Sequence, residues 1–224
     1  MPGSAYDTAH ETGAGTGTAH AAAYWSVPLL RAIPAVLLAG TVTFLQDHSV
    51  TVGLTGFGSY AALSGVIIVV MSARLLWPGI SRRVFIAQGS ITVAAGVAAL
   101  IFSGGGLPFF LFLLSAWAAV TGFLELFSGL RSRGRSVLAR DWVFVGALTA
   151  LFSVVVLLVP PDLQQQFTGP DGVERVLTAS VIVVGALGAY CAVIGIYLVI
   201  AGLSLKWSTA AVELDPLTES GSRT

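Results

Sequence analysis

Six long apolar stretches alternate with short polar segments along the chain. They cover about residues 24–45, 51–73, 84–103, 107–130, 142–160 and 176–205. An α-helix needs roughly 20 mostly apolar residues to cross a hydrocarbon core about 30 Å thick. The stretches lack the alternation of a transmembrane β-barrel, whereas helices satisfy their own backbone hydrogen bonds in lipid. The pattern therefore predicts an all-α integral membrane protein with six transmembrane helices.

A six-residue pattern recurs in three of these stretches. Its first position is aromatic, the second is a small residue, the third is Ala, the fourth is Leu or Val, the fifth is any residue, and the sixth is Gly. Its copies begin at Tyr60, Trp117 and Tyr190, and the first two lie 57 positions apart, an offset that also carries Arg31 onto Gln88. A shared offset at several positions indicates a duplicated unit. We expect three two-helix hairpins in a pseudo-threefold bundle, because parallel repeats are related by an axis along the membrane normal. The expected hairpins cover about residues 24–80, 81–137 and 138–207.

Each copy of the pattern places small residues on one helix face, because residues four apart lie above one another. The resulting strips consist of Ala61 and Gly65, Ala118 and Gly122, and Cys191 and Gly195. Such strips let helix backbones approach closely in lipid. The aromatic residues that begin the pattern could line a pore or a ligand site, but packing beside the strips is the favoured interpretation.

The two ends of the chain differ in kind from the apolar stretches. Residues 1–23 are rich in Gly, Ala, Thr and Ser and contain no Lys or Arg, so they lack the charged start of a signal peptide. We expect a disordered cytoplasmic tail there and a flexible, polar cytoplasmic tail over 208–224.

Composition agrees with a lipid bilayer as the surroundings of the chain. Hydrophobic residues make up 55% and charged residues 10%, and the mean hydropathy is +0.87. A soluble domain carries about a quarter charged residues. The formal net charge of zero gives no support for a nucleic-acid partner.

Basic residues collect on one side of the predicted membrane. The ends of the chain and the segments after the second and fourth stretches hold nine of the eleven: Arg74, Arg82, Arg83, Arg131, Arg133, Arg135, Arg140, Lys206 and Arg223. The opposite loops hold Arg175 alone. Lys and Arg in short loops favour the cytoplasmic side, so we expect both termini in the cytoplasm. The run from Arg131 to Arg135 could also bind anionic lipid or nucleic acid, but a role as topology anchor is favoured.

Side chains with catalytic or metal-binding chemistry are scarce. The histidines are His10, His20 and His48, and none has the spacing of a metal ligand with a nearby carboxylate or cysteine. Cys191 is the only cysteine and is interpreted as a small packing residue. No His or Asp in the apolar stretches could activate a nucleophile. We therefore expect no metal site, no cofactor and no enzyme.

Two charges interrupt the apolar stretches, Arg31 in the first and Glu125 in the fourth. At about 1.5 Å per residue, both should lie roughly 7–11 Å deep from the cytoplasmic side, with Gln88 shallower. Either each side chain reaches toward the membrane surface, or the two pair, with Gln88 as a further member, and connect the first two hairpins. Protonation of Glu125 would weaken such a pair, which makes it a candidate acid sensor.

Several of these motifs resemble the HdeD-like acid-resistance membrane proteins. The stretch from Phe57 through Tyr60 to Gly65 is similar to a signature of that family that begins Phe-Gly-x-Tyr. The stretch from Trp117 through Gly122 to Glu125 resembles a second signature. Leu29-Leu30-Arg31 resembles the first-helix motif, with Ala32 in place of the usual Gly. The third unit departs most, because its external loop over 160–175 is longer.

The resemblance implies a bacterial inner-membrane protein of stress or acid resistance, built from a short membrane repeat without a known reaction. Three function classes follow: a structural or protective membrane protein, a transporter or channel for protons or small solutes, and an assembly partner of itself or another membrane protein. The scarcity of embedded polar residues favours the first, since transport paths need polar groups along their length.

Overall fold

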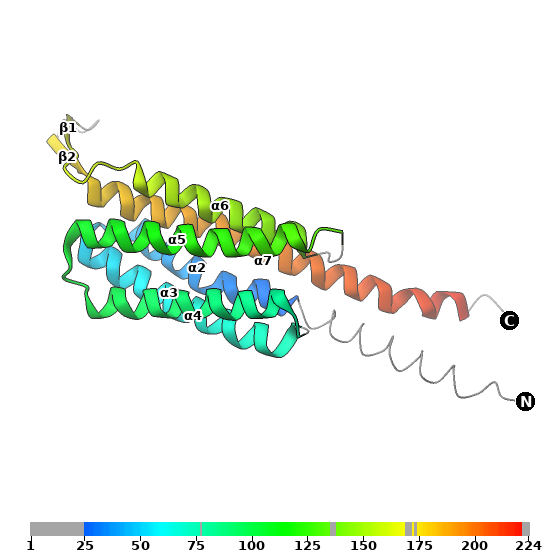
Figure 1. The fold of residues 1–224 in the computed structure, drawn as a ribbon. Coiled ribbons are helices and arrows are strands. Elements are labelled where there is room, and N and C mark those ends of the chain that lie inside the picture. Colours follow the sequence, from blue (N-terminus) through cyan, green and yellow to red (C-terminus); the bar gives the residue numbers. More distant parts are fainter. Residues whose placement is uncertain (1–24, 77, 135–137, 169–171, 173, 221–224) are drawn as a thin grey trace, which may run out of the picture.

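The computed structural model describes residues 25–220 apart from 77, 135–137, 169–171 and 173. Six helices in this part of the chain are long and apolar enough to cross a membrane, so the prediction of six such helices is confirmed. They form an up-and-down bundle joined by short turns, except that a longer connection leads from the fifth helix to the sixth (Figure 1). The helices are α2 (Ser26–Phe44), α3 (Val50–Leu75), α4 (Ile80–Ile101), α5 (Gly106–Arg131), α6 (Ala139–Leu157) and α7 (Ala179–Ser220).

Local chemistry explains where two of the helices begin and how two hydroxyl groups within a third helix are hydrogen-bonded. The Ser49 hydroxyl accepts a hydrogen bond from the backbone N–H of Val52 at 3.4 Å and caps α3. Gly106 has a φ of +76°, a left-handed conformation that favours glycine, where the chain turns from α4 into α5. Thr41 and Thr43 donate to carbonyls one turn earlier in α2, which satisfies their hydroxyls where lipid offers no partner.

The closest helix pairs are α3 with α4, α5 with α6, and α2 with α7. Each pair therefore joins the second helix of one predicted repeat to the first helix of the next, and α7 returns to α2. The helices within each predicted hairpin contact one another less. Hairpins defined along the sequence are thus not the tightest packing units of this bundle.

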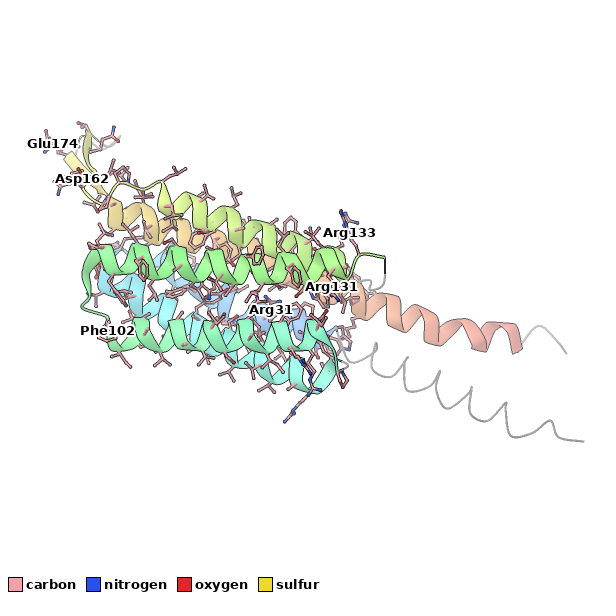
Figure 2. All side chains as sticks on the ribbon, in the orientation of Figure 1. Arg31, Phe102, Arg131, Arg133, Asp162 and Glu174 are labelled. Atoms are coloured by element: carbon pink, nitrogen blue, oxygen red, sulfur yellow. The ribbon has the colours of Figure 1, made fainter. Side chains whose placement is uncertain are left out.

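Apolar side chains occupy both the interior and the outer surface. Leu54, Phe57 and Phe110 are completely buried, whereas Phe112 and Phe123 on the outside are 70% and 65% exposed. Side chains project from the whole length of the bundle (Figure 2). An apolar exterior of this extent fits a lipid environment rather than water.

The loop over 160–175 and the first residues of the sixth apolar stretch, which was expected to be helical from residue 176, form an unpredicted β-hairpin. Strands β1 (Gln164–Thr168) and β2 (Glu174–Thr178) pair antiparallel, with Gln164 opposite Thr178. The hairpin projects beyond the bundle at the end opposite Arg131 and Arg133 (Figures 1 and 2).

The structure describes the backbone of part of the predicted C-terminal tail. Residues 1–23 lie outside the described part of the chain. Helix α7 continues past its apolar span, Ala179–Trp207, as far as Ser220, so the backbone over most of the predicted C-terminal tail is helical. Flexibility of this segment stays a prediction.

Candidate functional site

The two embedded charges meet in the bundle interior. Arg31 on α2 donates from Nη1 to Oε1 of Glu125 on α5 at 2.9 Å, and from Nη2 to Oε2 at 3.3 Å. Gln88 on α4 donates from Nε2 to Oε2 of the same carboxylate at 2.9 Å. Three helices are therefore joined through one carboxylate. We call Arg31, Gln88 and Glu125 the carboxylate cluster.

Burial makes these contacts matter for stability. The side chain of Glu125 is 3% exposed and that of Arg31 is 14% exposed, and Gln88 is 2% exposed. A carboxylate removed from water is costly unless it is paired and hydrogen-bonded. The bidentate guanidinium and the amide N–H supply that compensation here, since charge-assisted bonds are the strongest of their kind.

Helix α4 begins before the apolar stretch from which the depth of Gln88 was predicted. An apolar stretch that begins at residue 84 predicts that Gln88 lies nearer the membrane surface than Arg31. Helix α4 begins at Ile80 instead, so Gln88 lies about two turns inside it and reaches the same carboxylate as Arg31.

Polar atoms near the cluster have unused hydrogen-bonding capacity. Among the described residues, the buried Oε1 of Gln88 and Oγ of Ser128 have no hydrogen-bond partner. Two cavities of ≈ 20 Å³ each are lined in part by Arg31, and Glu125 also lines the second. This volume is enough for about one water molecule each.

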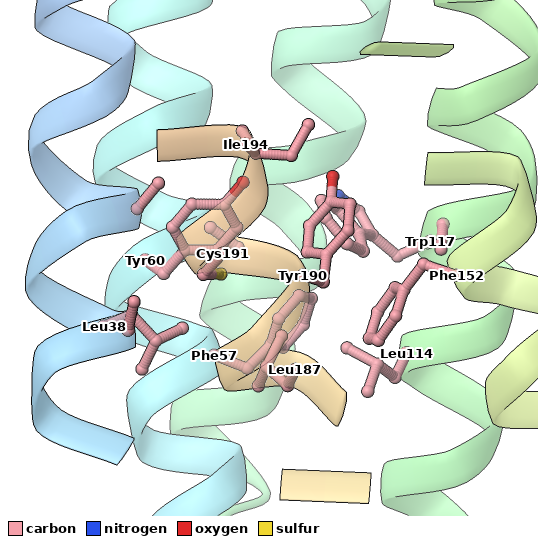
Figure 3. Close-up of a cluster of buried hydrophobic side chains, with 14 of the residues drawn as sticks. Leu38, Phe57, Tyr60, Leu114, Trp117, Phe152, Leu187, Tyr190, Cys191 and Ile194 are labelled. Carbon is pink, nitrogen blue, oxygen red and sulfur yellow. The ribbon is translucent and has the colours of Figure 1, made fainter. Parts of the chain in front are cut away.

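The aromatic residues of the recurring pattern converge in the middle of the bundle (Figure 3). Trp117 lies edge-on to Tyr60, with ring centroids 6.2 Å apart, and to Tyr190, at 6.4 Å. Phe57 also packs edge-on to Trp117 at 5.0 Å, and Phe152 stacks on Tyr190 at 4.5 Å. These geometries are favourable for aromatic pairs, and they fill the interior with rings.

Two threonines that sequence reasoning missed hold two of these aromatic residues. The Trp117 indole Nε1 donates to Thr92 Oγ1 at 3.2 Å, and the Tyr190 hydroxyl bonds Thr149 Oγ1 at 2.8 Å. Thr92 and Thr149 lie 57 positions apart in the sequence. The repeat offset was therefore a signal that could have identified both.

The small-residue strips lie where helices approach most closely. A Cβ added to Gly65 would come within 2.7 Å of the Gly89 carbonyl oxygen on α4, and one added to Gly122 within 2.7 Å of the Ala150 nitrogen on α6. A Cβ on Gly195 would meet the Val36 side chain of α2 at 2.8 Å. The adjoining Ala61, Ala118 and Cys191 are completely buried.

The predicted topology anchors that the structure describes are at one end of the bundle. The exposed ones are Arg74, Arg83, Arg131, Arg133 and Arg140. Arg82 donates from Nη2 to the Ala73 carbonyl at 2.9 Å, and Arg135 lies outside the described residues.

Another polar contact missed from the sequence joins α6 and α7. The Tyr197 hydroxyl donates to Asp141 Oδ1 at 2.6 Å, and the Tyr197 ring stacks on Phe144 with centroids 4.1 Å apart. Tyr197 and Asp141 are 56 positions apart, and no motif connected them.

The chemistry of these sites is that of helix association. Within the described part of the chain, no group of three His, Cys, Asp or Glu side chains is placed to hold a metal ion. The carboxylate cluster binds three helices together. No protein-family model, curated protein or solved structure matches the chain.

Proposed function

We propose that the chain is a bacterial inner-membrane protein that protects the membrane under stress without catalysing a reaction. The observation that carries this proposal is the aromatic contact among Tyr60, Trp117 and Tyr190, which come from α3, α5 and α7. All three residues are at least 93% buried, since their exposures are 7%, 5% and 7%. A conducting channel along the bundle interior needs open space at this position, whereas rings in mutual contact favour a structural role.

A repeat architecture of three two-helix units is part of the proposal. In such an architecture the close pairs α3–α4, α5–α6 and α7–α2 would be equivalent under a threefold relationship. The contacts of Trp117 with Thr92 and of Tyr190 with Thr149 are equivalent in the second and third units. In the first unit the corresponding position on α2 is Ala35, which offers no hydroxyl to Tyr60.

The arginine-bearing end of the bundle is assigned to the cytoplasm. Arg131 and Arg133 are at this end, whereas Asp162 and Glu174 are at the opposite end (Figure 2). This distribution is that expected from the preference of Lys and Arg for cytoplasmic loops. A link to acid or stress resistance rests on the resemblance to HdeD-like proteins.

Reconstitution of the full-length chain into liposomes tests the protective role against transport. Proton flux is followed with an enclosed pH-sensitive dye, and solute flux by release of small labelled solutes. We expect rates equal to those of protein-free liposomes. Flux that rises with protein content and changes in Glu125→Gln would contradict the proposal and support the transporter alternative.

Survival of bacterial cells tests the link to stress. Cells that express the chain should survive acid shock better than cells with the empty vector. Equal survival would contradict a protective role. A single co-purifying membrane protein required for the protection would instead support the assembly-partner alternative.

A further inference from the structure

A groove separates α6 from α7 at the arginine-bearing end of the bundle. These helices contact each other little, because α6 packs on α5 and α7 packs on α2. The groove has a volume of ≈ 660 Å³, within the range of ligand sites in proteins. Its lining includes Arg140, Asp141, Phe144, Tyr197, Ile200 and Ser204.

The mouth of the groove presents one positive and one negative group side by side. Arg140 is exposed at the start of α6 and is followed by the half-buried Asp141. The Tyr197 hydroxyl donates to Asp141 Oδ1 at 2.6 Å and so orients the carboxylate. Among the described residues, Arg140 takes part in no hydrogen bond or ion pair, and Asp141 Oδ2 is not hydrogen-bonded.

Apolar side chains of both helices line the rest of the groove. Phe144 and Ile200 line it and remain 42% and 59% exposed. Phe144 lies about 6 Å farther along the helix than Arg140, at a rise of ~1.5 Å per residue. A charged mouth above apolar walls matches a phospholipid, with its headgroup at the membrane surface and its acyl chains below.

We propose that the α6–α7 groove binds a phospholipid whose zwitterionic headgroup carries a primary ammonium. Arg140 donates to the phosphate oxygens, and Asp141 accepts from the ammonium N–H, so both bonds are charge-assisted. A phosphatidylglycerol headgroup offers Asp141 only neutral hydroxyl donors, and its net negative charge is repelled by the carboxylate. A choline headgroup has no N–H to donate. The two side chains therefore select phosphatidylethanolamine over phosphatidylglycerol and phosphatidylcholine.

Native mass spectrometry of the full-length protein tests this selection. The protein is mixed with equal amounts of the three phospholipids with identical acyl chains, and the bound lipids are counted. We expect phosphatidylethanolamine to be retained preferentially. Asp141→Asn should reduce its preference over phosphatidylcholine on the order of tenfold, because one charge-assisted bond is lost. Arg140→Gln should weaken retention of phosphatidylethanolamine itself.

Two controls separate lipid recognition from misfolding and from general charge. Asp141→Asn keeps an oxygen that can accept the Tyr197 hydroxyl, and melting temperatures in the same detergent report whether each variant is folded. Arg74→Gln removes one positive charge from the same end of the bundle, on α3, and should leave the lipid preference unchanged.

Three results of the lipid competition would overturn the proposal. They are equal retention of the three lipids, a preference for phosphatidylglycerol, or an unchanged preference in folded Asp141→Asn. A stable dimer that covers α6 and α7 and excludes lipid would also overturn it and assign the groove to a second copy of the chain.

Discussion

Arg31 and Glu125 are joined by two hydrogen bonds, at 2.9 and 3.3 Å, although 94 positions separate them along the chain. Their contact links α2 to α5, two helices that are not among the close pairs of the bundle. Gln88 bonds to the same carboxylate from α4. One buried carboxylate thereby connects helices from the first and second predicted repeats.

A double-mutant cycle tests the contribution of this contact to stability. Arg31→Ala and Glu125→Ala should each lower the free energy of unfolding in detergent by ~3–5 kcal/mol, because each leaves the other charge buried without its partner. The double mutant should be no worse than the more damaging single mutant. Losses that simply add would show that the two side chains do not stabilise each other, and exposed Arg74→Ala is the control for a change of charge alone.

Close backbone approach at the glycines is tested by matched substitutions. Gly65→Ala and Gly122→Ala should lower the melting temperature, since their new Cβ atoms would lie 2.7 Å from backbone atoms of the neighbouring helix. Gly65→Leu and Gly122→Leu should be worse. Gly40→Ala is the control, because nothing lies within 4 Å of its Cβ position, and it should be neutral or slightly stabilising. Equal melting of Gly65→Ala, Gly122→Ala and Gly40→Ala would rule out the packing role.

Thr92→Val tests the hydrogen bond to the Trp117 indole. Valine keeps the shape of threonine but removes the acceptor, so a buried N–H loses its partner. Interhelical bonds in membranes average roughly 0.6 kcal/mol, and a buried unsatisfied donor costs ~1–3 kcal/mol. We expect a loss of about 1 kcal/mol by reversible unfolding in detergent. Thr55→Val, at an exposed position on α3, is the control, and an equal effect at both sites would contradict the assignment.

Reporter fusions test the orientation in the membrane. Fusions after residues 80, 135 and 210 should report the cytoplasm, and fusions near residues 48 and 168 should report the outside, because basic residues collect at the first set of positions. Activity of a phosphatase, which needs the oxidising exterior, and fluorescence of a green fluorescent protein distinguish the two sides. A cytoplasmic signal at residue 168 would contradict the six-span topology.

The sequence by itself determined the elements that depend on local composition. Lipid forces each long apolar stretch to satisfy its backbone internally, so length and hydropathy suffice to predict six helices. Arg31 and Glu125 could also be recognised in the sequence, because charged side chains within such stretches are rare. The repeat offset was visible because it compares the chain only with itself.

Tertiary structure decided which side chains meet. The partner of Gly65 is a carbonyl on α4, and the partner of Asp141 is a hydroxyl on α7. Both depend on how helices fit together, where complementary shape over many residues outweighs nearness along the chain. The packing of α4 likewise places Gln88 beside Glu125. The first turn of α4 includes Ser81, Arg82 and Arg83, which are polar residues that hydropathy alone assigns to a loop.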